Sequence, residues 1–419
     1  MHALKRLIES IVPRHLYRTL LAPYHLAWTY LRALQYGFPA HKLTVIGVTG
    51  TKGKSSVTEM LAAALTAGGH TVAVSSTIHF KIGDEVRPNK YKMTLPGRGF
   101  IQKFLAEAVT KGADFAVVEL TSEGALQYRH LLLSLDAVVF TNLEREHIES
   151  HGSLENYFAA KMRIGHALVR SKKRPRAIIA NADSEYGRRF LALPVESHVP
   201  FQIKDADGLM LKDEGSTFTY EGVHFAIPHP GAFSVMNALA ALKTAAFFRV
   251  PLEKSAEALS ALTRIPGRAE HIDAGQDFLA VVDYAHTPDS LRALYEAYGT
   301  RRKICVLGNT GGGRDTWKRP EMGRIADAYC DEVILTNEDP YDEDPGLIVK
   351  AMAGGMKKKI PHIIMDRREA IRAALALAKS GDAVLVTGKG TDPYLMEANG
   401  VRTPWSDAQV VREELNQRV

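Results

Sequence analysis

Short apolar runs rich in β-branched residues alternate with stretches of helical spacing from residue 42 to about residue 200. The runs predict strands, and the stretches at residues 55–66 and 100–111 predict helices that connect them. The predicted strands of this part cover residues 43–48, 71–75, 115–120, 136–141 and 177–180. Strands that alternate with helices are typical of a mainly parallel sheet with helices on its faces, so the predicted fold class is α/β.

The pattern changes twice after this first series. Between about residues 198 and 228, small and polar residues alternate, most clearly at 216–220. This pattern predicts a β-meander at the edge of the domain. Arg-Ile-Pro-Gly at residues 264–267 predicts a hinge. A second series of predicted strands covers residues 279–283, 303–307, 332–336, 362–365 and 383–387. We therefore predict a central domain over residues 42–265 and a Rossmann-like C-terminal domain over residues 266–419.

Residues 1–41 precede the first predicted strand and follow a different pattern. Apolar residues at helical spacing over residues 4–12 and 16–34 predict a short helical segment, with interruptions at Pro13 and Pro23. Charged residues break the second stretch too often for a membrane span, and no cleavage site of a signal peptide follows. Two interpretations stay open: the segment packs on the next domain, or it is amphipathic and binds a membrane surface or a partner protein.

Composition and charge narrow the classes of function. Hydrophobic residues make up 46% and charged residues 24% of the 419 residues, which is ordinary for a folded globular protein. The formal charge is +6, but residues 1–40 hold five basic residues and one acidic residue. The rest of the chain is nearly neutral and predicts no nucleic-acid partner. Cys305 and Cys330 are too few for a disulfide framework and lack metal-ligand spacing, so they fit a reducing cytoplasm, where we expect the protein.

The sharpest motif directly follows the predicted strand 43–48 and opens the predicted helix 55–66. Its residues are Gly50, Thr51, Lys52, Gly53, Lys54, Ser55 and Ser56. Small residues there expose backbone N–H groups to a polyphosphate, and a helix N-terminus favours anions. Lys54 would reach the terminal phosphates, and Ser55 would bind Mg²⁺. Val48 stands where the generic loop has its first glycine, and the alternative is a glycine-rich turn that only enters a helix.

A Gly-Thr-x-Gly-Lys loop without that first glycine resembles the ATP site of the Mur ligase family. Further stretches between residues 43 and 412 resemble family motifs in order and approximate spacing. They are Glu119-Leu120-Thr121-Ser122, Thr141 to Ile148, His151-Gly152 with Tyr157 to Lys161, Gly231-Ala232-Phe233 with Asn237-Ala238, Pro266 to Glu270, Val282 to Asp289, Gly311 to Arg319 and Gly388-Lys389-Gly390. Ser234 replaces the first Asn of one signature. The resemblance implies a phosphate-loop-type central domain and ATP-dependent amide bond formation on a muramoyl-peptide-like acceptor.

The resemblance also implies roles for single residues near the nucleotide. Ser55 and Glu119 would hold one Mg²⁺ at the phosphates, and Glu119 with His147 would hold a second. Lys161 matches a lysine that the family carbamylates; the alternative is an exposed helix lysine.

Four further residues are candidates for nucleotide binding: the first two match family contacts from the central domain and hinge, and the last two lie at the end of the first predicted strand of the C-terminal domain, the usual edge for ligand contact. These residues are Asn237, Arg268, Asp283 and His286. Asp283 matches a carboxylate that binds the ribose or the hinge. A structural histidine whose hydrogen bonds are satisfied within the fold is the alternative for His286.

The remaining candidates concern the two substrates that are joined. We assign Thr121, Ser122 and Arg129 to substrate binding. Arg314 is interpreted as the partner of the incoming amino acid's α-carboxylate, because a guanidinium group binds a carboxylate through two hydrogen bonds. Lys318 and Arg319 fit either this site or a solvated basic surface.

The residues that select the amino acid depart from the pattern of diaminopimelate-adding members. The selector comprises Glu338, Asp339, Tyr341, Gly388 and Asp392. Glu-Asp-Pro-Tyr replaces Asp-Asn-Pro-Arg, which removes a cation and adds negative charge. The change favours a side chain with a terminal ammonium group, such as L-lysine, over diaminopimelate. The alternative is that the loop carboxylates face solvent.

A second departure concerns the acceptor. The family holds its UDP-sugar in an N-terminal domain, whereas only 42 residues precede the first predicted strand. We therefore expect an acceptor that is held differently, lacks the UDP group or is presented by a partner chain. The alternatives for function are a family ligase with a non-UDP acceptor, such as a γ-linked peptide or another cell-wall polymer, and a non-catalytic ATP-binding subunit. The presence of Lys54, Glu119, His147 and Lys161 together argues against the non-catalytic subunit.

Overall fold

The computed structural model describes residues 14–97, 99–146, 148–299, 301–313 and 315–417. Its first helix, α2 (Arg14–Gln35), contains Pro23 and is followed by a short turn of 3₁₀ helix, η1 (Pro39–Lys42). The later part of α2 packs on the next domain, because Ala33 is fully buried and the Thr29 hydroxyl donates a hydrogen bond to the Tyr128 carbonyl (3.4 Å). Leu31 and Leu34 remain exposed. None of the helices in the described residues has the length and apolar character that crossing a bilayer requires.

The central sheet has eight strands in the order β4-β3-β2-β5-β1-β6-β7-β8. Their bounds are β1 Thr44–Thr49, β2 Val72–Ser75, β3 His79–Ile82, β4 Glu85–Pro88, β5 Phe115–Glu119, β6 Ala137–Phe140, β7 Ala177–Asn181 and β8 Ser197–Phe201. The six strands β2, β5, β1, β6, β7 and β8 run parallel to one another. At the edge beside β2, the strands β3 and β4 form an antiparallel hairpin. This arrangement confirms the predicted α/β fold with a mainly parallel sheet.

Helices cover both faces of this sheet, as the nearly continuous apolar runs of its central strands require. They are α3 Lys54–Ala67, α4 Phe100–Thr110, α5 Ser122–Leu126, α6 Ile148–His151, α7 Leu154–Val169, α8 Glu185–Leu191, α9 Ala232–Phe247 and α10 Leu252–Ala261. Ile46 and Val48 of β1 point to a core shared with α3 and α9. Val45 points to a second core shared with α4 and α7. The strand that leads into the phosphate loop is therefore buried on both sides.

The predicted meander forms a small sheet of its own. It consists of β9 (Asp207–Lys212), β10 (Gly215–Tyr220) and β11 (Val223–Ile227) in antiparallel order, after the 3₁₀ turn η2 (Ile203–Asp205). Phe218 and Phe225 stack with ring centres 5.2 Å apart and join the core that contains α9. The residues near 198, which the polar alternation grouped with the meander, belong instead to β8 of the central sheet.

The C-terminal part of the chain forms a six-stranded sheet in the order β12-β13-β17-β14-β15-β16. Its strands are β12 Glu270–Ile272, β13 Leu279–Asp283, β14 Lys303–Leu307, β15 Glu332–Leu335, β16 His362–Ile363 and β17 Ala383–Thr387, with a hairpin of β18 Tyr394–Met396 and β19 Arg402–Pro404 around η3 Ala398–Gly400. Only β12 pairs antiparallel within this sheet. Helices α11 Pro288–Ala297, α12 Lys318–Tyr329 and α13 Pro345–Ala353 share one core, and α14 Arg367–Leu377 and α15 Asp407–Asn416 share the other.

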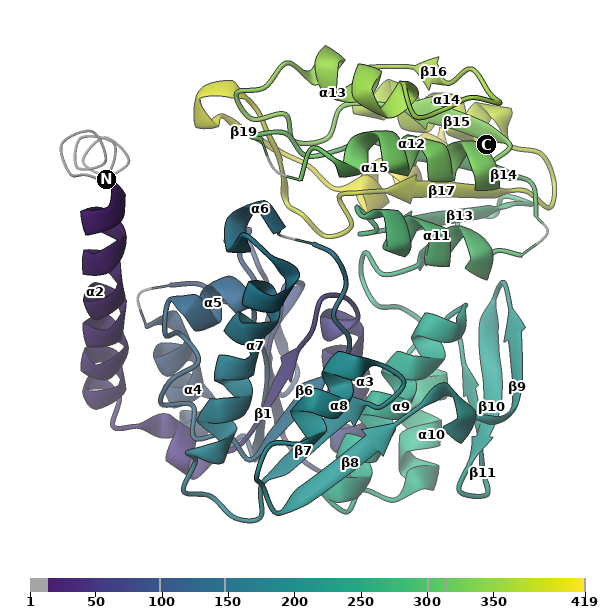
Figure 1. Cartoon of the computed structure of the whole chain (residues 1–419). Helices are drawn as coiled ribbons and strands as arrows, with labels where there is room; N and C mark the ends of the chain where they lie inside the picture. The colour runs from purple at the N-terminus through teal and green to yellow at the C-terminus, as the bar shows by residue number, and fades with distance from the viewer. Residues whose placement is uncertain (1–13, 98, 147, 300, 314, 418–419) are drawn as a thin grey trace.

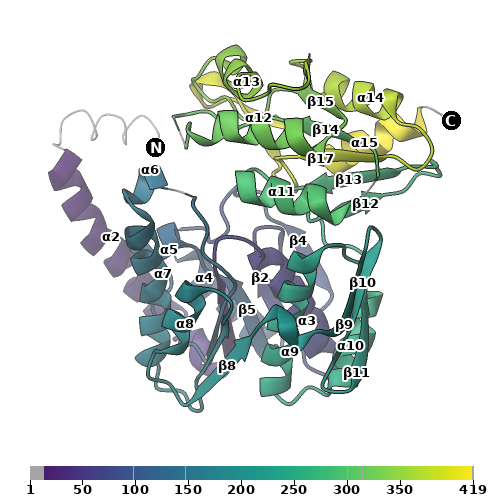
Figure 2. The ribbon, with the colours of Figure 1, turned by 45° about the vertical axis from the view of Figure 1, so that its right-hand side comes forward.

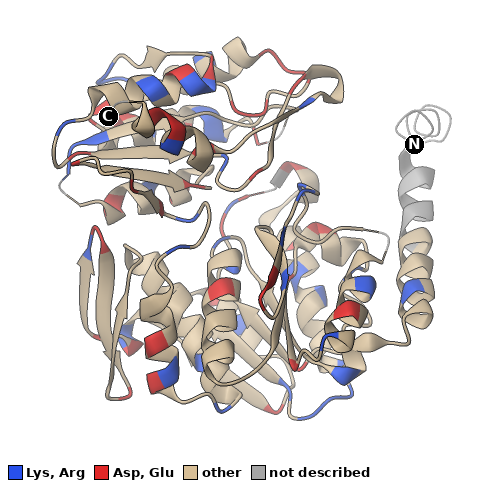
Figure 3. Ribbon diagram, turned by 180° about the vertical axis from the view of Figure 1, so that it is seen from behind, with Lys and Arg blue, Asp and Glu red and all other residues tan. Residues whose placement is uncertain are grey.

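The two α/β units lie against each other, and α11 and α6 lie near the boundary between them (Figures 1 and 2). Lys and Arg are interspersed with Asp and Glu over both units (Figure 3), which agrees with the nearly neutral charge of this part of the chain. Cys305 of β14 and Cys330 before β15 are joined by a disulfide, a pairing that the sequence analysis did not predict. Adjacent parallel strands bring the two cysteines together, a proximity that their separation of 25 residues did not reveal.

Candidate functional site

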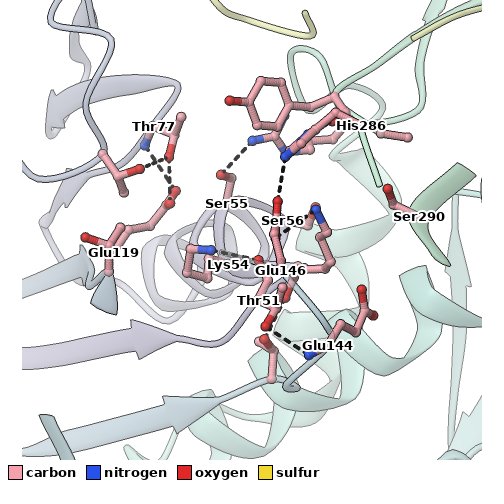
Figure 4. A pocket seen from close by; sticks show the side chains of 18 of the residues that line it. Thr51, Lys54, Ser55, Ser56, Thr77, Glu119, Glu144, Glu146, His286 and Ser290 are labelled. Atoms are coloured by element: carbon pink, nitrogen blue, oxygen red, sulfur yellow. Dashed lines mark hydrogen bonds and ion pairs between the residues drawn. The ribbon is translucent and has the colours of Figure 1, made fainter. Parts of the chain in front are cut away.

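The phosphate loop joins the carboxyl end of β1 to the N-terminus of α3 (Figure 4). Gly50 and Gly53 have φ values of 145° and 81°, which side chains disfavour. A Cβ on Gly50 would lie 1.9 Å from Thr141 Oγ1, and a Cβ on Gly53 would lie 2.2 Å from Asn237 Oδ1. Both glycines therefore allow a close approach that a larger residue would block.

Residues after β6 fix the conformation of the loop. The backbone N–H groups of Thr51 and Lys52 donate to the Asn142 carbonyl and side-chain oxygens, each at 2.9 Å. The Glu144 N–H donates to Thr51 Oγ1 at 3.0 Å. The first N–H groups of α3 have no partner within the helix, as at every helix N-terminus, and they are the groups that a phosphate would use.

Two lysines converge on the carbonyl oxygens of the loop. Lys54 Nζ donates to the carbonyls of Gly50 (3.2 Å) and Thr51 (2.9 Å), and Lys161 Nζ of α7 donates to that of Gly50 (2.7 Å). Lys161 is 1% exposed, so the alternative of an exposed helix lysine is wrong. Burial lowers the pKa of Lys54. Burial and the neighbouring Lys54 ammonium group together hold the pKa of Lys161 well below its ordinary value.

Glu119 ends β5 beside the loop and is fully buried. Its Oε1 accepts a hydrogen bond from the Thr77 N–H (3.2 Å), and its Oε2 accepts one from the Thr77 hydroxyl (2.9 Å), which also contacts Thr94 Oγ1 (2.8 Å). The sequence reasoning missed both threonines. Thr77 follows β2, whose carboxyl end adjoins that of β5, and this position at the ligand-binding edge was the available signal.

The oxygen donors near the loop suit Mg²⁺ shared with phosphates. Among the described residues no group of three or more His, Cys, Asp and Glu could hold a metal alone. Ser55 and Glu119 offer the hydroxyl and carboxylate oxygens that Mg²⁺ prefers when substrate oxygens complete its shell. Glu144, which lines the same cavity, has a buried Oε2 without a hydrogen-bond partner, and burial raises its pKa. His147, the other predicted ligand, lies outside the described residues.

A chain of charged groups crosses from the loop to the C-terminal unit. Lys52 Nζ lies 3.1 Å from Glu146 Oε2, and Glu146 Oε1 lies 2.8 Å from His286 Nε2. His286 Nδ1 is 2.5 Å from the Tyr284 carbonyl. Burial and the positive charge of Lys52 lower the pKa of His286 to about 4. His286 therefore has protein partners at both nitrogens while it also lines the cavity. The sequence reasoning did not single out Glu146.

The hinge region contacts the loop directly. Arg268 Nη2 donates to Ser55 Oγ at 3.1 Å, and its guanidinium lies over the Tyr284 ring. Asp283 accepts hydrogen bonds from the N–H groups of Ala269 and Ala285, each at 2.6 Å. Asp283 was expected to bind either the ribose or the hinge, and its hydrogen bond with the Ala269 N–H is a contact with the hinge region. Burial raises its pKa.

The predicted selector residues are gathered at the other end of the site. Asp339 Oδ1 accepts hydrogen bonds from Lys389 Nζ and the Met396 N–H, each at 2.8 Å. Lys92, from the loop between β4 and α4, reaches Asp339 Oδ2 (2.5 Å) and Asp392 Oδ2 (3.0 Å). Burial alone would raise the pKa of Asp339, but the Lys389 and Lys92 ammonium groups outweigh it and hold the pKa below its ordinary value. The alternative of solvent-facing loop carboxylates does not hold for Asp339, which is 3% exposed.

The Glu338 carboxylate occupies space that a side chain at position 388 would fill. Glu338 is buried, its Oε1 accepts a hydrogen bond from the Thr310 hydroxyl (2.9 Å), and its Oε2 has no partner. A Cβ on Gly388, whose φ is 107°, would lie 2.2 Å from that Oε2. Burial raises the pKa of Glu338. Tyr341 lines the same region, with its ring centre 5.7 Å from Lys92 Nζ.

The residues assigned to substrate binding divide into two groups. Thr121 and Arg129 line the cavity. Thr121 Oγ1 caps α5 at the Gly124 N–H (3.0 Å), and Arg129 donates to the Leu95 carbonyl. Ser122 is buried away from the cavity and bonds to Glu123 Oε2 at 3.1 Å.

Arg314 lies outside the described residues, but the two basic residues that follow it are described. Lys318 and Arg319 are 6% and 5% exposed, so the solvated basic surface is wrong. Arg319 pairs with Glu343, and Lys318 lines the cavity.

One cavity of about 910 Å³ joins these groups. It brings together most of the predicted residues, namely Thr51, Lys52, Gly53, Lys54, Ser55, Ser56, Glu119, Thr121, Arg129, Asn237, Arg268, Asp283, His286, Glu338, Asp339, Tyr341, Gly388 and Asp392. Gly50, Ser122 and Lys161 are not among its lining residues. The lining residues that sequence reasoning missed include Thr77, Lys92 and Thr94, and it gave no role to Glu144 and Glu146, which stand in the motif from Thr141 to Ile148.

The fold and this cavity define the class of protein. It has two α/β units, a phosphate loop of the nucleotide-binding type in the first unit, and a charged cavity lined by residues of both. Two family models match the chain, the Mur ligase middle domain over residues 48–245 and the Mur ligase glutamate ligase domain over residues 267–390. The chain belongs to the Mur ligase family, a family of enzymes, as the resemblance predicted.

Relatives agree with this assignment. The chain is 37% identical, over 91% of its length and 80% of the relative's, to the UDP-N-acetylmuramoyl-L-alanyl-D-glutamate–2,6-diaminopimelate ligase of Caldanaerobacter subterraneus. It is 35% identical to the UDP-N-acetylmuramyl-tripeptide synthetase of a Roseiflexus species, over 92% of the chain and 81% of that relative.

Solved structures show the same fold. A diaminopimelate ligase structure is 31% identical with a TM-score of 0.61, over 90% of this chain and 79% of that one. The Mycobacterium tuberculosis folylpolyglutamate synthase, which was solved with ADP, has a TM-score of 0.71 at 17% identity, over 87% of this chain and 92% of that one. At this identity the second similarity concerns the fold alone.

Proposed function

We propose that the protein is an ATP-dependent ligase that joins the amine of an amino acid to a carboxylate of a muramoyl-peptide-like peptidoglycan precursor. The observation that carries this proposal is the single cavity, which has the phosphate loop at one end and the selector residues at the other. An enzyme that transfers the activation energy of ATP to an amide bond requires both ends within one enclosure, because the activated carboxylate must meet the amine without reaching water. The relatives named above are ligases of muramoyl peptides, which supports this substrate class.

In the proposed reaction an acceptor carboxylate oxygen attacks the γ-phosphorus of ATP. A new O–P bond forms, the bond to the bridging oxygen of ADP breaks, and the acceptor becomes an acyl phosphate. The amine nitrogen of the amino acid then attacks the acyl carbon. The C–N bond forms, the C–O bond to phosphate breaks, the nitrogen loses a proton, and ADP and phosphate are released.

The chain's own residues supply positive charge rather than a nucleophile for these steps. Lys54 would leave the Gly50 and Thr51 carbonyls to bind the transferred phosphoryl group, and the N–H groups at the start of α3 would bind the neighbouring phosphates. Ser55 and Glu119 would hold Mg²⁺, which neutralises phosphate charge when it is bound. Arg314, by its sequence position, would bind the α-carboxylate of the amino acid.

Lys161 is proposed to be carbamylated on Nζ. Carbamylation requires a neutral amine that attacks carbon dioxide, and the lowered pKa of Lys161 supports a neutral amine. A C–N bond to carbon dioxide would form, Nζ would release one proton, and the product would be an anion beside Lys54. The carbamate nitrogen would keep one N–H, which could still donate to the Gly50 carbonyl.

Product analysis tests the proposed function. The protein is incubated with ATP, Mg²⁺, UDP-N-acetylmuramoyl-L-alanyl-D-glutamate and one amino acid from a panel, and phosphate release and product mass are measured. A parallel arm uses the same muramoyl dipeptide without UDP. Product formation with either acceptor supports the ligase, and the arm that reacts identifies the acceptor. ATP binding without turnover in either arm would overturn the proposal in favour of a non-catalytic ATP-binding subunit.

A further inference from the structure

Lys92 connects the central domain to the selector of the C-terminal domain. It lies in the loop between β4 and α4 with a φ of 53°, and its ammonium group contacts both Asp339 and Asp392. Its side chain is 20% exposed, whereas those of Asp339 and Asp392 are 4% and 9% exposed. A cation of one domain is therefore inserted between two nearly buried carboxylates of the other.

This contact changes the charge that an incoming amino acid would meet. The sequence alone gives the selector three carboxylates, Glu338, Asp339 and Asp392. In the fold, Lys389 lies 2.8 Å from Asp339 and 3.2 Å from Asp392, and Lys92 contacts the same pair. Two ammonium groups thus neutralise two carboxylates. The excess of negative charge that favoured a lone ammonium group on the substrate is reduced to the buried Glu338, whose Oε2 has no hydrogen-bond partner among the described residues.

We infer that Lys92 is a specificity-determining residue that acts from the central domain on the amino-acid site. By pairing with Asp339 and Asp392 it disfavours an amino acid whose side chain ends in an ammonium group alone. It favours one whose side chain ends in both an ammonium group and a carboxylate. This inference rests on the proposed function, because it takes the selector cavity as the place where the amino acid binds.

The physical basis is competition for the same carboxylates. An amino acid that ends only in ammonium must displace Lys92 or accept like-charge repulsion from it, which costs binding free energy in a partly buried site. A side chain that also carries a carboxylate can pair that group with Lys92. Its ammonium group then balances the remaining negative charge. A purely structural ion pair would affect both kinds of amino acid equally, so the two roles predict different measurements.

The experiment compares L-lysine with meso-diaminopimelate on the full chain. Calorimetry measures binding of each amino acid in the presence of ADP and phosphate, and kcat and KM are measured with the acceptor that reacts. We expect wild type to prefer meso-diaminopimelate. Lys92→Gln should shift the ratio of the two affinities toward L-lysine by at least about tenfold, mainly through KM. Lys92→Arg should keep the wild-type ratio within about threefold, because it retains the charge.

Lys90→Gln provides the matched control, since Lys90 is an exposed lysine of the same loop and should leave the ratio unchanged. An equal change for both amino acids in Lys92→Gln, or no change, would overturn the inference. Wild-type protein that binds neither amino acid would also overturn it. Failure of the proposed function has a different signature, since binding with the expected ratios but no turnover leaves the inference intact and removes only the ligase reaction.

Discussion

The two ends of the cavity arrange their charges in opposite ways. At the phosphate loop, Lys54 and Lys161 donate to backbone carbonyls, and Glu119 accepts from the N–H and hydroxyl of Thr77. At the selector, the ammonium groups of Lys92 and Lys389 pair directly with carboxylates. The hydrogen-bond partners of Lys54, Lys161 and Glu119 are thus neutral groups, although Lys52 of the same loop pairs with Glu146, whereas the charges of the second end largely cancel.

This difference indicates how each end recognises its ligand. An uncompensated cluster binds a highly charged group strongly but is costly to bury, because desolvated charges destabilise the fold. A cluster whose charges are paired costs less free energy to bury. It discriminates between ligands through the small difference in binding free energy that one added charge makes. Single substitutions should therefore have large effects on activity at the phosphate end and moderate effects on selectivity at the selector end.

The largest expected effect follows from Lys54→Ala. Removal of the ammonium group should reduce ATP-dependent product formation by about 10³-fold, because the transferred phosphoryl group loses its cation. The measurement is ADP release under saturating acceptor and amino acid. Lys103→Ala, at an exposed lysine of α4, serves as the control and should retain activity. A fully active Lys54→Ala variant would show that the loop does not bind the transferred phosphate.

Lys161→Met should separate activity from stability. Activity should fall by about 10²-fold, and the carbamate signal from carbon-13 bicarbonate in the NMR spectrum of wild type should be missing. The melting temperature should rise, because a buried amine is replaced by an apolar chain of similar length. Lys161→Glu, which carries a negative charge at the same place, should recover part of the activity.

The pH dependence of unfolding tests the same residue. Because the folded-state pKa of Lys161 is lowered, the unfolded chain binds more protons between that pKa and the ordinary value of 10.5. This contribution to stability is largest above 10.5 and is lost as the pH falls through that window. When carbon dioxide is excluded, so that Lys161 is a free amine, the free energy of unfolding of Lys161→Met should therefore decrease less between pH 10 and pH 8 than that of wild type. Equal slopes for the two proteins would contradict the lowered pKa.

At the selector end, Gly388→Ala should impair amino-acid use alone. The added Cβ would clash with Glu338 Oε2 and displace its carboxylate. We expect kcat/KM for the amino acid to fall about tenfold while KM for ATP stays the same. Gly381→Ala controls for backbone strain, since Gly381 has a φ of 82° and open space around its Cβ position. Similar losses in both variants would assign the effect to backbone conformation.

The sequence predicted more of the phosphate end than of the selector end, for a physical reason. The loop is a contiguous motif after a strand, so Gly53, Lys54 and Ser55 could be located from local pattern alone. Lys92 could not, because its partners Asp339 and Asp392 lie 247 and 300 residues further along the chain, and no local pattern records a contact across domains. The same applies to Thr77 and Glu146. The central strands were predicted well because they are buried on both faces and therefore continuously apolar. The hairpin gave no clear signal, because β3 is buried only at alternate residues and β4 is exposed at the edge of the sheet.

The smallest expected effect concerns Asp283, which lies between the two ends and holds the hinge. Both carboxylate oxygens accept backbone N–H groups, from Ala269 and Ala285. In Asp283→Asn the amide oxygen can accept only one of them, and the NH₂ group faces the other donor. One buried hydrogen bond is lost, so urea unfolding should show a loss of about 1–3 kcal/mol.

Asp273→Asn is the matched control, because Asp273 is exposed and accepts a single N–H from Gly275 (2.9 Å), which an amide oxygen can also accept. It should change stability by less than about 0.5 kcal/mol. Because the hinge positions Arg268 against Ser55, Asp283→Asn should also raise KM for ATP a few-fold while leaving the preference between amino acids unchanged. A shift in that preference instead would mean that the hinge, rather than Lys92, sets the geometry of the selector.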